Sequence, residues 1–263
     1  MHKDTEQSSC FDRIWASFIF FTRLPLWRLH EPRTECYKTV VEHWPLTGWL
    51  TGGLMAATLY AGSLFLPYLV AVLLAIAVRM LTTGALHEDG LADFFDGFGG
   101  GGSDRGRILT IMKDSHIGTF GVLGLVLYVM LLASALFSMS PQVAALTILA
   151  ADPFAKMLTA GLITLPYARK EEEAKAKVVY RKISPLAIVS LALQGLLPML
   201  PLIYHLFPLK GVRGSFLPFI PSFFIFSLLY LFIRSRLRGY TGDCCGAVCL
   251  MVELSIYLTA CAL

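Results

Sequence analysis

The chain has 263 residues, of which 56% are hydrophobic and 15% charged, and its net charge is +4. Soluble domains contain about 45–50% apolar and about 25% charged residues, so this composition excludes soluble, disordered, collagenous and coiled-coil chains and leaves a polytopic membrane protein. The scattered basic residues exclude a nucleic-acid-binding surface, and the six cysteines, without a CxxC pair, are expected to be reduced structural thiols.

The N-terminal segment, residues 1–43, precedes the first long apolar run. Its most apolar part, Phe11–Leu26, is short and is interrupted by Arg13 and Arg23. A membrane span needs about 20 mostly apolar residues, so we expect an interfacial helix here rather than a span. The segment also lacks the basic region and apolar run of a cleaved signal peptide.

Long uncharged runs follow, the first of them between Glu42 and Arg79 and the next from Ile117 to Ala151. We therefore expect an all-α bundle of about seven transmembrane helices, which forms a single integral membrane domain over residues 1–263. The expected spans lie at about 46–65, 68–86, 117–139, 142–166, 183–207, 215–233 and 245–263.

Basic loop residues predict the orientation, because Lys and Arg are enriched in cytoplasmic loops. The loops after the fourth and sixth expected spans carry Arg169, Lys170, Lys175, Lys177, Arg181 and Lys182, and Arg234, Arg236 and Arg238. We therefore expect a multi-pass protein of the bacterial inner membrane. Segment 87–116 and the N-terminus would face the cytoplasm, and the C-terminus would lie outside.

An acidic segment follows the second expected span directly. Asp89, Asp93 and Asp96 are spaced i, i+4 and i+7, which places them within about 60° of one another on a helix, whereas Glu88 lies about 100° away. Carboxylates on one stripe repel each other unless a cation lies between them, and Mg²⁺ is a natural partner. The pattern predicts a Mg²⁺ site in which these three aspartates are ligands and catalytic residues, with Asp114 as a fourth ligand.

A glycine run, Gly99–Gly102, leads to Arg105, Arg107 and Lys113. Glycines let backbone N–H groups approach an anion, and basic side chains pair with phosphate oxygens, so we expect these three cations to bind substrate. Metal-binding carboxylates beside phosphate-binding cations are typical of phosphoryl transfer. The alternative is a solvated acidic loop with a flexible glycine linker. His87 is either a proton acceptor or a packing residue.

Charged residues also occur inside the expected spans, where they are costly and often functional. Asp152 and Lys156 are four residues apart and are expected to neutralise each other. Glu253 has no cation nearby in the sequence. It either pairs with Lys156 or Arg79 across the bundle or contacts the substrate, and it is included among the candidate substrate-binding residues.

The last loop reads RGYTGDCCGA and places Asp243 at the start of the seventh expected span. An aspartate at a helix N-terminus can be a plain N-cap. It can also be a ligand for metal or substrate. The predicted topology places Asp243 on the same face as the acidic segment, and we therefore count it among the candidate catalytic residues.

The acidic segment, LHEDGLADFFDG followed by RILTIMKDSHIGTFGVLGL, resembles the signature of the cobalamin synthase family. Four further motifs extend the resemblance over nearly the whole chain, in order, and Glu253 matches a recurrent acid of the family. These motifs are FFTRLP (20–25), WPLTGWLTGG (44–53), LPYAR (165–169) and RGYTGDCCGA (238–247).

The resemblance implies a membrane-bound adenosylcobinamide-GDP ribazoletransferase that uses Mg²⁺. Such an enzyme joins adenosylcobinamide-GDP to α-ribazole, or to its 5′-phosphate, releases GMP, and completes cobalamin (or its 5′-phosphate) in the last steps of biosynthesis. The implied partners are these small molecules and the lipid bilayer, with no nucleic acid, and an oligomer is not excluded.

Two other functions fit parts of the sequence. A CDP-alcohol phosphotransferase would explain the start of a DxxDG motif at Asp93–Gly97, but Gly100 and Gly101 replace the Ala-Arg that should follow. A secondary transporter would use Asp152, Lys156 and Glu253 as sites at the membrane midplane and would leave the acidic segment unexplained.

Overall fold

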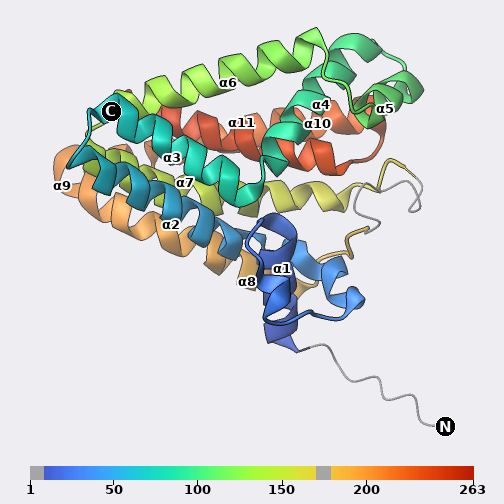
Figure 1. Ribbon diagram of the computed structural model, residues 1–263, viewed down its shortest axis with the longest axis horizontal. Coiled ribbons are helices and arrows are strands. Elements are labelled where there is room, and N and C mark those ends of the chain that lie inside the picture. The colour runs from blue at the N-terminus through green and yellow to red at the C-terminus, as the bar shows by residue number, and fades with distance from the viewer. Residues whose placement is uncertain (1–8, 170–178) are drawn as a thin grey trace.

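A computed structural model of the chain describes residues 9–169 and 179–263, and in this part it is all-α, as the sequence predicts (Figure 1). Lys170, Lys175 and Lys177, which contributed to the predicted topology, lie outside the described residues. The α-helices are α1 (Cys10–Phe21), α2 (Trp44–Ser63), α3 (Tyr68–Thr83), α4 (Leu86–Gly101), α5 (Arg105–Lys113), α6 (Thr119–Phe137), α7 (Pro141–Thr159), α8 (Pro185–Leu196), α9 (Leu200–Phe216), α10 (Ile220–Leu237) and α11 (Gly242–Ala260).

Several helical segments of the described chain are long and apolar enough to cross a membrane. Four segments pass this test of length and hydropathy alone. A fifth is obtained if α3 and α4, with a bend of 89° between them, are counted as one broken span. The four are Thr119–Phe137, Pro141–Thr164, Pro185–Leu237 and Gly242–Ala260. These segments support a multi-pass membrane protein.

The segment Pro185–Leu237 is too long for one crossing. Its 53 residues would extend about 80 Å as a straight helix, against a hydrocarbon core of about 30 Å. Short 3₁₀ turns interrupt it, and α8 and α9 run to one end of the molecule before α10 returns (Figure 1). The two spans expected at 183–207 and 215–233 stay a prediction for this segment.

The N-terminal helix α1 lies across the end of the bundle, beside the start of α2 (Figure 1). It packs mainly against the 3₁₀ segment Thr34–His43, and the Ser17 hydroxyl donates to the Val40 carbonyl at 3.1 Å. With 12 residues it is too short for a span. Its placement in the membrane interface stays a prediction.

A sharp bend between α3 and α4 redirects the acidic segment. Gly84 and Ala85 both have left-handed backbone angles, with φ of 65° and 55°. The left-handed backbone favours glycine at position 84, and a Cβ there would also lie 2.4 Å from Nε of Arg23, so that this side chain would have to move. The acidic segment is therefore helical, as expected, but it starts a new helix at a large angle to α3.

The glycine run has a different role from the one expected. Gly99–Gly101 belong to α4 and do not form an open anion-binding loop. A Cβ at Gly101 would lie 2.8 Å from Cα of Ile108, and one at Gly97 would lie 2.5 Å from Cγ of Met112. Gly101, together with Gly97 just before the run, therefore lets α5 pack closely against α4.

Two buried ion pairs lie within the bundle, one inside α7 and one between α3 and α11. Lys156 pairs with Asp152, as expected, and the Thr51 hydroxyl donates to Oδ2 of the same carboxylate at 2.7 Å. Arg79 donates to both carboxylate oxygens of Glu253, each at 2.7 Å. Glu253 is fully buried, and the structure therefore realises the cross-bundle pairing with Arg79, one of its two expected alternatives.

Helices α4 and α11 meet at backbone contact. A Cβ at Gly90 would lie 3.1 Å from Cα of Asp243, and a Cβ at Gly246 would lie 3.2 Å from Cα of His87. At such distances a larger residue on either helix would force the other helix to shift by a few tenths of an ångström. The crossing brings the beginning of α4, with Asp89, against the beginning of α11, with Asp243.

Candidate active site

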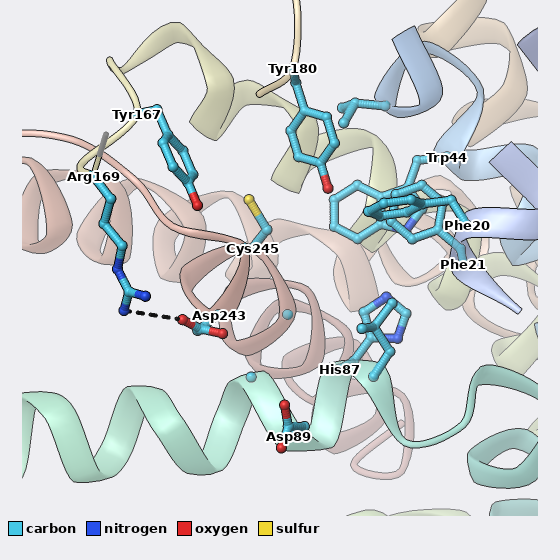
Figure 2. Close-up of a pocket in the computed structure, with 15 residues that line it drawn as sticks. Phe20, Phe21, Trp44, His87, Asp89, Tyr167, Arg169, Tyr180, Asp243 and Cys245 are labelled. Carbon is cyan, nitrogen blue, oxygen red and sulfur yellow. Dashed lines mark ion pairs between the residues drawn. The ribbon is translucent and has the colours of Figure 1, made fainter. Parts of the chain in front are cut away.

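A cavity of about 120 Å³ lies at this helix crossing. Charged groups gather at one end of it and aromatic rings at the other (Figure 2). Its lining comes from α1, from the 3₁₀ segment Thr34–His43, from the start of α2, from α4, from α11 and from three residues between α7 and α8 that the structure describes. The residues are Phe20, Phe21, Val41, Trp44, Leu86, His87, Asp89, Gly90, Tyr167, Arg169, Tyr180, Gly242, Asp243, Cys245 and Gly246.

The charged end consists of Asp89, Asp243 and Arg169. Nη2 of Arg169 lies 3.9 Å from Oδ2 of Asp243, and the two side chains are only 4% and 7% exposed (Figure 2). The same guanidinium donates to the Leu109 carbonyl at 3.1 Å, and its buried Nε has no hydrogen-bond partner in the described part of the chain. A buried cation with an unused donor is suited to an anionic ligand such as phosphate.

Asp243 is not the N-cap of α11. Thr241 takes that position, and its hydroxyl accepts from the Cys244 N–H at 3.2 Å. Asp243 lies in the first turn of the helix and lines the cavity. The capping alternative for Asp243 is therefore wrong, because a residue two positions earlier already satisfies the helix terminus.

The aromatic end is a stack of nearly parallel rings. Phe21 and Trp44 have centroids 5.0 Å apart at 13°, and Trp44 and His87 are 5.8 Å apart at 12°. Tyr180 lies beside these rings, and burial raises the pKa of its phenol above the ordinary value, whereas Tyr167 lies beside Arg169 at the charged end (Figure 2). This end of the cavity is therefore flat-walled, uncharged and mostly apolar.

The aspartates of the acidic stripe have different surroundings. Asp89 lines the cavity, and Asp93 is half-buried one turn further along α4. The carboxylate of Asp96 accepts from the N–H groups of Gly118 and Gly121, at 2.7 and 2.8 Å, at the start of α6. It therefore holds α6 against α4 and does not line the cavity.

Asp114 also lies away from the cavity lining, in the exposed turn between α5 and α6. Its Oδ1 accepts from the His116 N–H at 3.0 Å, and this hydrogen bond keeps the pKa of the carboxyl below its usual value. The metal-binding roles of Asp93, Asp96 and Asp114 stay predictions.

The cations expected to bind phosphate do not line the cavity. Arg105 donates to the carbonyls of Leu237 and Ala168, each at 2.7 Å, and thereby ties α5 to two other segments. Arg107 and Lys113 are exposed. Among the described residues Arg169 is the cation at the cavity, although the sequence predicted a role for it only in topology and in the LPYAR motif.

The residues at the charged end suit a hard divalent cation that takes only one or two ligands from the protein. No group of three or more His, Cys, Asp or Glu side chains in residues 9–169 and 179–263 is arranged to hold a metal ion. Mg²⁺ commonly takes one or two carboxylates and completes its octahedron with water and substrate phosphate. Asp89 and Asp243 are the two carboxylates of the cavity lining, and which of the expected residues hold Mg²⁺ stays a prediction.

Comparison with known proteins gives one consistent result. A family model described as cobalamin-5-phosphate synthase matches residues 13–261. The chain belongs to this family. It is 34% identical over 256 residues to the adenosylcobinamide-GDP ribazoletransferase of Leptospira interrogans, with 94% of each chain covered. It is 33% identical to the enzymes of the same name from Shewanella baltica (90% of this chain and 89% of the relative) and Shewanella frigidimarina (93% and 92%). No solved structure matches the chain.

All five motifs that carry the resemblance contribute to the cavity lining. Phe20, Trp44, Asp89, Arg169 and Asp243 each come from a different one. The sequence analysis nevertheless missed the aromatic residues and Arg169 as site residues. The signal that could have identified them is that each lies in one of these motifs. The motifs stand at separate places in the chain, and the fold brings them together.

Proposed function

We propose that the chain is an adenosylcobinamide-GDP ribazoletransferase and that the cavity at the crossing of α4 and α11 is its active site. The observation that carries this proposal is the pairing of Asp89 and Asp243 beside Arg169, at a cavity lined by every motif of the family resemblance. Two carboxylates and a buried cation are the groups that a metal-assisted transfer between phosphates requires.

In the proposed reaction the 3′-hydroxyl of α-ribazole attacks the phosphorus attached to the aminopropanol arm of the corrinoid. A P–O bond to the ribazole oxygen forms, the P–O bond to GMP breaks, and the hydroxyl proton passes to a carboxylate of the site. Asp89 and Asp243 are the candidates for this acceptor. Arg169 pairs with the charge on the diphosphate.

Asp89 and Asp243 would hold Mg²⁺ against the diphosphate. When bound, the metal supplies charge stabilisation at the phosphoryl oxygens. The predicted membrane arrangement completes the proposal, with about seven spans in the bacterial inner membrane and the cavity open to the cytoplasm. The substrates, both water-soluble, would then reach the site from that side.

The test is a two-substrate assay on membranes that contain the protein. Adenosylcobinamide-GDP, α-ribazole and Mg²⁺ are supplied together, and both GMP and the corrinoid product are measured. The proposal expects equal amounts of GMP and cobalamin, and neither product when α-ribazole is left out. A CDP-alcohol phosphotransferase or a transporter would release no GMP from these substrates.

A further inference from the structure

The two ends of the cavity differ in chemistry, and this difference has a consequence for how a nucleoside would lie in it. Asp89, Asp243 and Arg169 mark the charged end, and Phe21, Trp44 and other rings mark the aromatic end (Figure 2). A ligand with a flat base at one end and reacting oxygens at the other matches this division in one orientation only.

Two buried polar atoms at the aromatic end have no hydrogen-bond partner in the described residues. They are Nε1 of Trp44 and Nε2 of His87, and both side chains line the cavity while being 2% and 3% exposed. An indole N–H is a donor only, and leaving it unpaired in a buried place is costly. A ligand that brings one acceptor would remove that cost.

Guanine fits this end poorly. Its edge carries several donors and acceptors, which need matching carboxylate, amide or backbone groups. No carboxylate or amide side chain lines the aromatic end among the residues that the structure describes. A benzimidazole, in contrast, is a mostly apolar bicycle whose remaining ring nitrogen accepts one hydrogen bond.

We infer that the aromatic end of the cavity binds the benzimidazole base of α-ribazole, stacked on the rings of Phe21, Trp44 and His87, so that the ribose lies between the base and Asp89. This inference rests on the proposed function and adds the substrate and its orientation. Parallel aromatic rings are suited to it, since stacking against a flat base contributes binding free energy without requiring a matching hydrogen-bond pattern. The diphosphate of the corrinoid substrate then takes the charged end.

Tryptophan emission provides a readout of binding, because Trp44 lines the cavity and is one of only four tryptophans in the chain. Binding of α-ribazole to the purified protein is measured by equilibrium dialysis and by quenching of tryptophan emission, and adenosylcobinamide-GDP and GMP are run as separate ligands. Trp44→Leu should weaken α-ribazole binding about tenfold or more, as loss of a stacking ring does, and leave binding of adenosylcobinamide-GDP within about twofold. Trp44→Phe keeps a ring and should retain most of the affinity while losing the quenching.

Trp49 supplies the matched control, since it lies on the same helix but is 45% exposed and absent from the cavity lining. Trp49→Phe should keep both affinity and quenching. The inference is overturned if GMP, and not α-ribazole, quenches Trp44, or if Trp44→Leu weakens both substrates equally or neither. Failure of the proposed function can be distinguished from failure of this inference. If the protein binds α-ribazole in this way but releases no GMP, the inference about the base holds and the proposed reaction is wrong.

Discussion

At the scale of single residues, the site depends on which polar groups are already engaged. Thr241 caps α11 and Asp96 holds the start of α6, so these side chains have structural partners. Asp243 faces Arg169 across 3.9 Å, at the edge of ion-pair distance. Both side chains also line the cavity, so a ligand there can contact the two groups together.

The difference between Thr241 and Asp243 can be tested by replacing each with serine. Serine caps helices about as well as threonine or aspartate, so Thr241→Ser should leave activity and thermal stability nearly unchanged. Asp243→Ser removes the carboxylate and should lower turnover at least about tenfold, or roughly 1.4 kcal/mol at the transition state, with little change in thermal stability. An active Asp243→Ser enzyme with ordinary Mg²⁺ dependence would remove Asp243 from the catalytic residues.

At the scale of elements, the crossing of α4 and α11 positions the carboxylate pair. Both helices need glycine at the contact, because a Cβ at Gly90 or Gly246 would lie about 3 Å from the backbone of the other helix. The buried ion pair between Arg79 and Glu253 joins α3 to α11 and limits how the latter can shift. The site geometry therefore depends on residues that contact no substrate.

Gly90→Ala tests the close contact. The added methyl group should push α4 and α11 apart, with a cost of about 1–3 kcal/mol typical of overpacking and a larger loss of activity than of stability. Gly53→Ala is the matched control, since a Cβ there meets nothing within 4 Å. Full activity in Gly90→Ala would show that the distance between the two helices is not important for the reaction.

Glu253→Gln tests the ion pair. Removal of one partner leaves the Arg79 charge buried without compensation, and such changes commonly cost about 3–5 kcal/mol. The double change Arg79→Leu with Glu253→Leu should be less destabilising than Glu253→Gln, because no charge then remains unpaired. Thermal unfolding in detergent measures both. A stable Glu253→Gln protein with impaired substrate binding would instead favour the substrate-contact alternative.

At the scale of the whole molecule, the sequence predicts helices better than contacts. Helices occupy the ranges of the expected spans, because apolar run length carries that information. Four segments of the described residues pass as spans by length and hydropathy, or five with the bent pair α3 and α4, so the number of about seven stays a prediction. The expected metal site placed Asp89, Asp93 and Asp96 together on geometric grounds, and α4 does carry all three. Helical periodicity does not show that Asp96 turns to the start of α6, nor that Asp243 and Arg169 reach Asp89, since these contacts join distant parts of the chain.

The predicted topology places Asp89, Arg169 and Asp243 on the cytoplasmic side, and cysteine labelling can test this arrangement. A variant without the six native cysteines receives a single cysteine at position 100 or, as the opposite control, at Leu64 in the turn after α2. A reagent that cannot cross the membrane should label position 64 in intact cells and label position 100 only after the membrane is opened. The reverse pattern would invert the topology and place the cavity outside.

The central claim is that the carboxylate pair at the cavity carries the transfer, and the most direct measurement compares two aspartates of the acidic segment. GMP release from adenosylcobinamide-GDP and α-ribazole is followed over a range of Mg²⁺ concentrations in Asp89→Asn and Asp114→Asn. Asp89 lines the cavity, and its loss should cut turnover roughly 10²-fold and raise the Mg²⁺ requirement, whereas Asp114 is exposed and its change should have little effect. Equal losses in the two variants, or a larger loss in Asp114→Asn, would contradict the account.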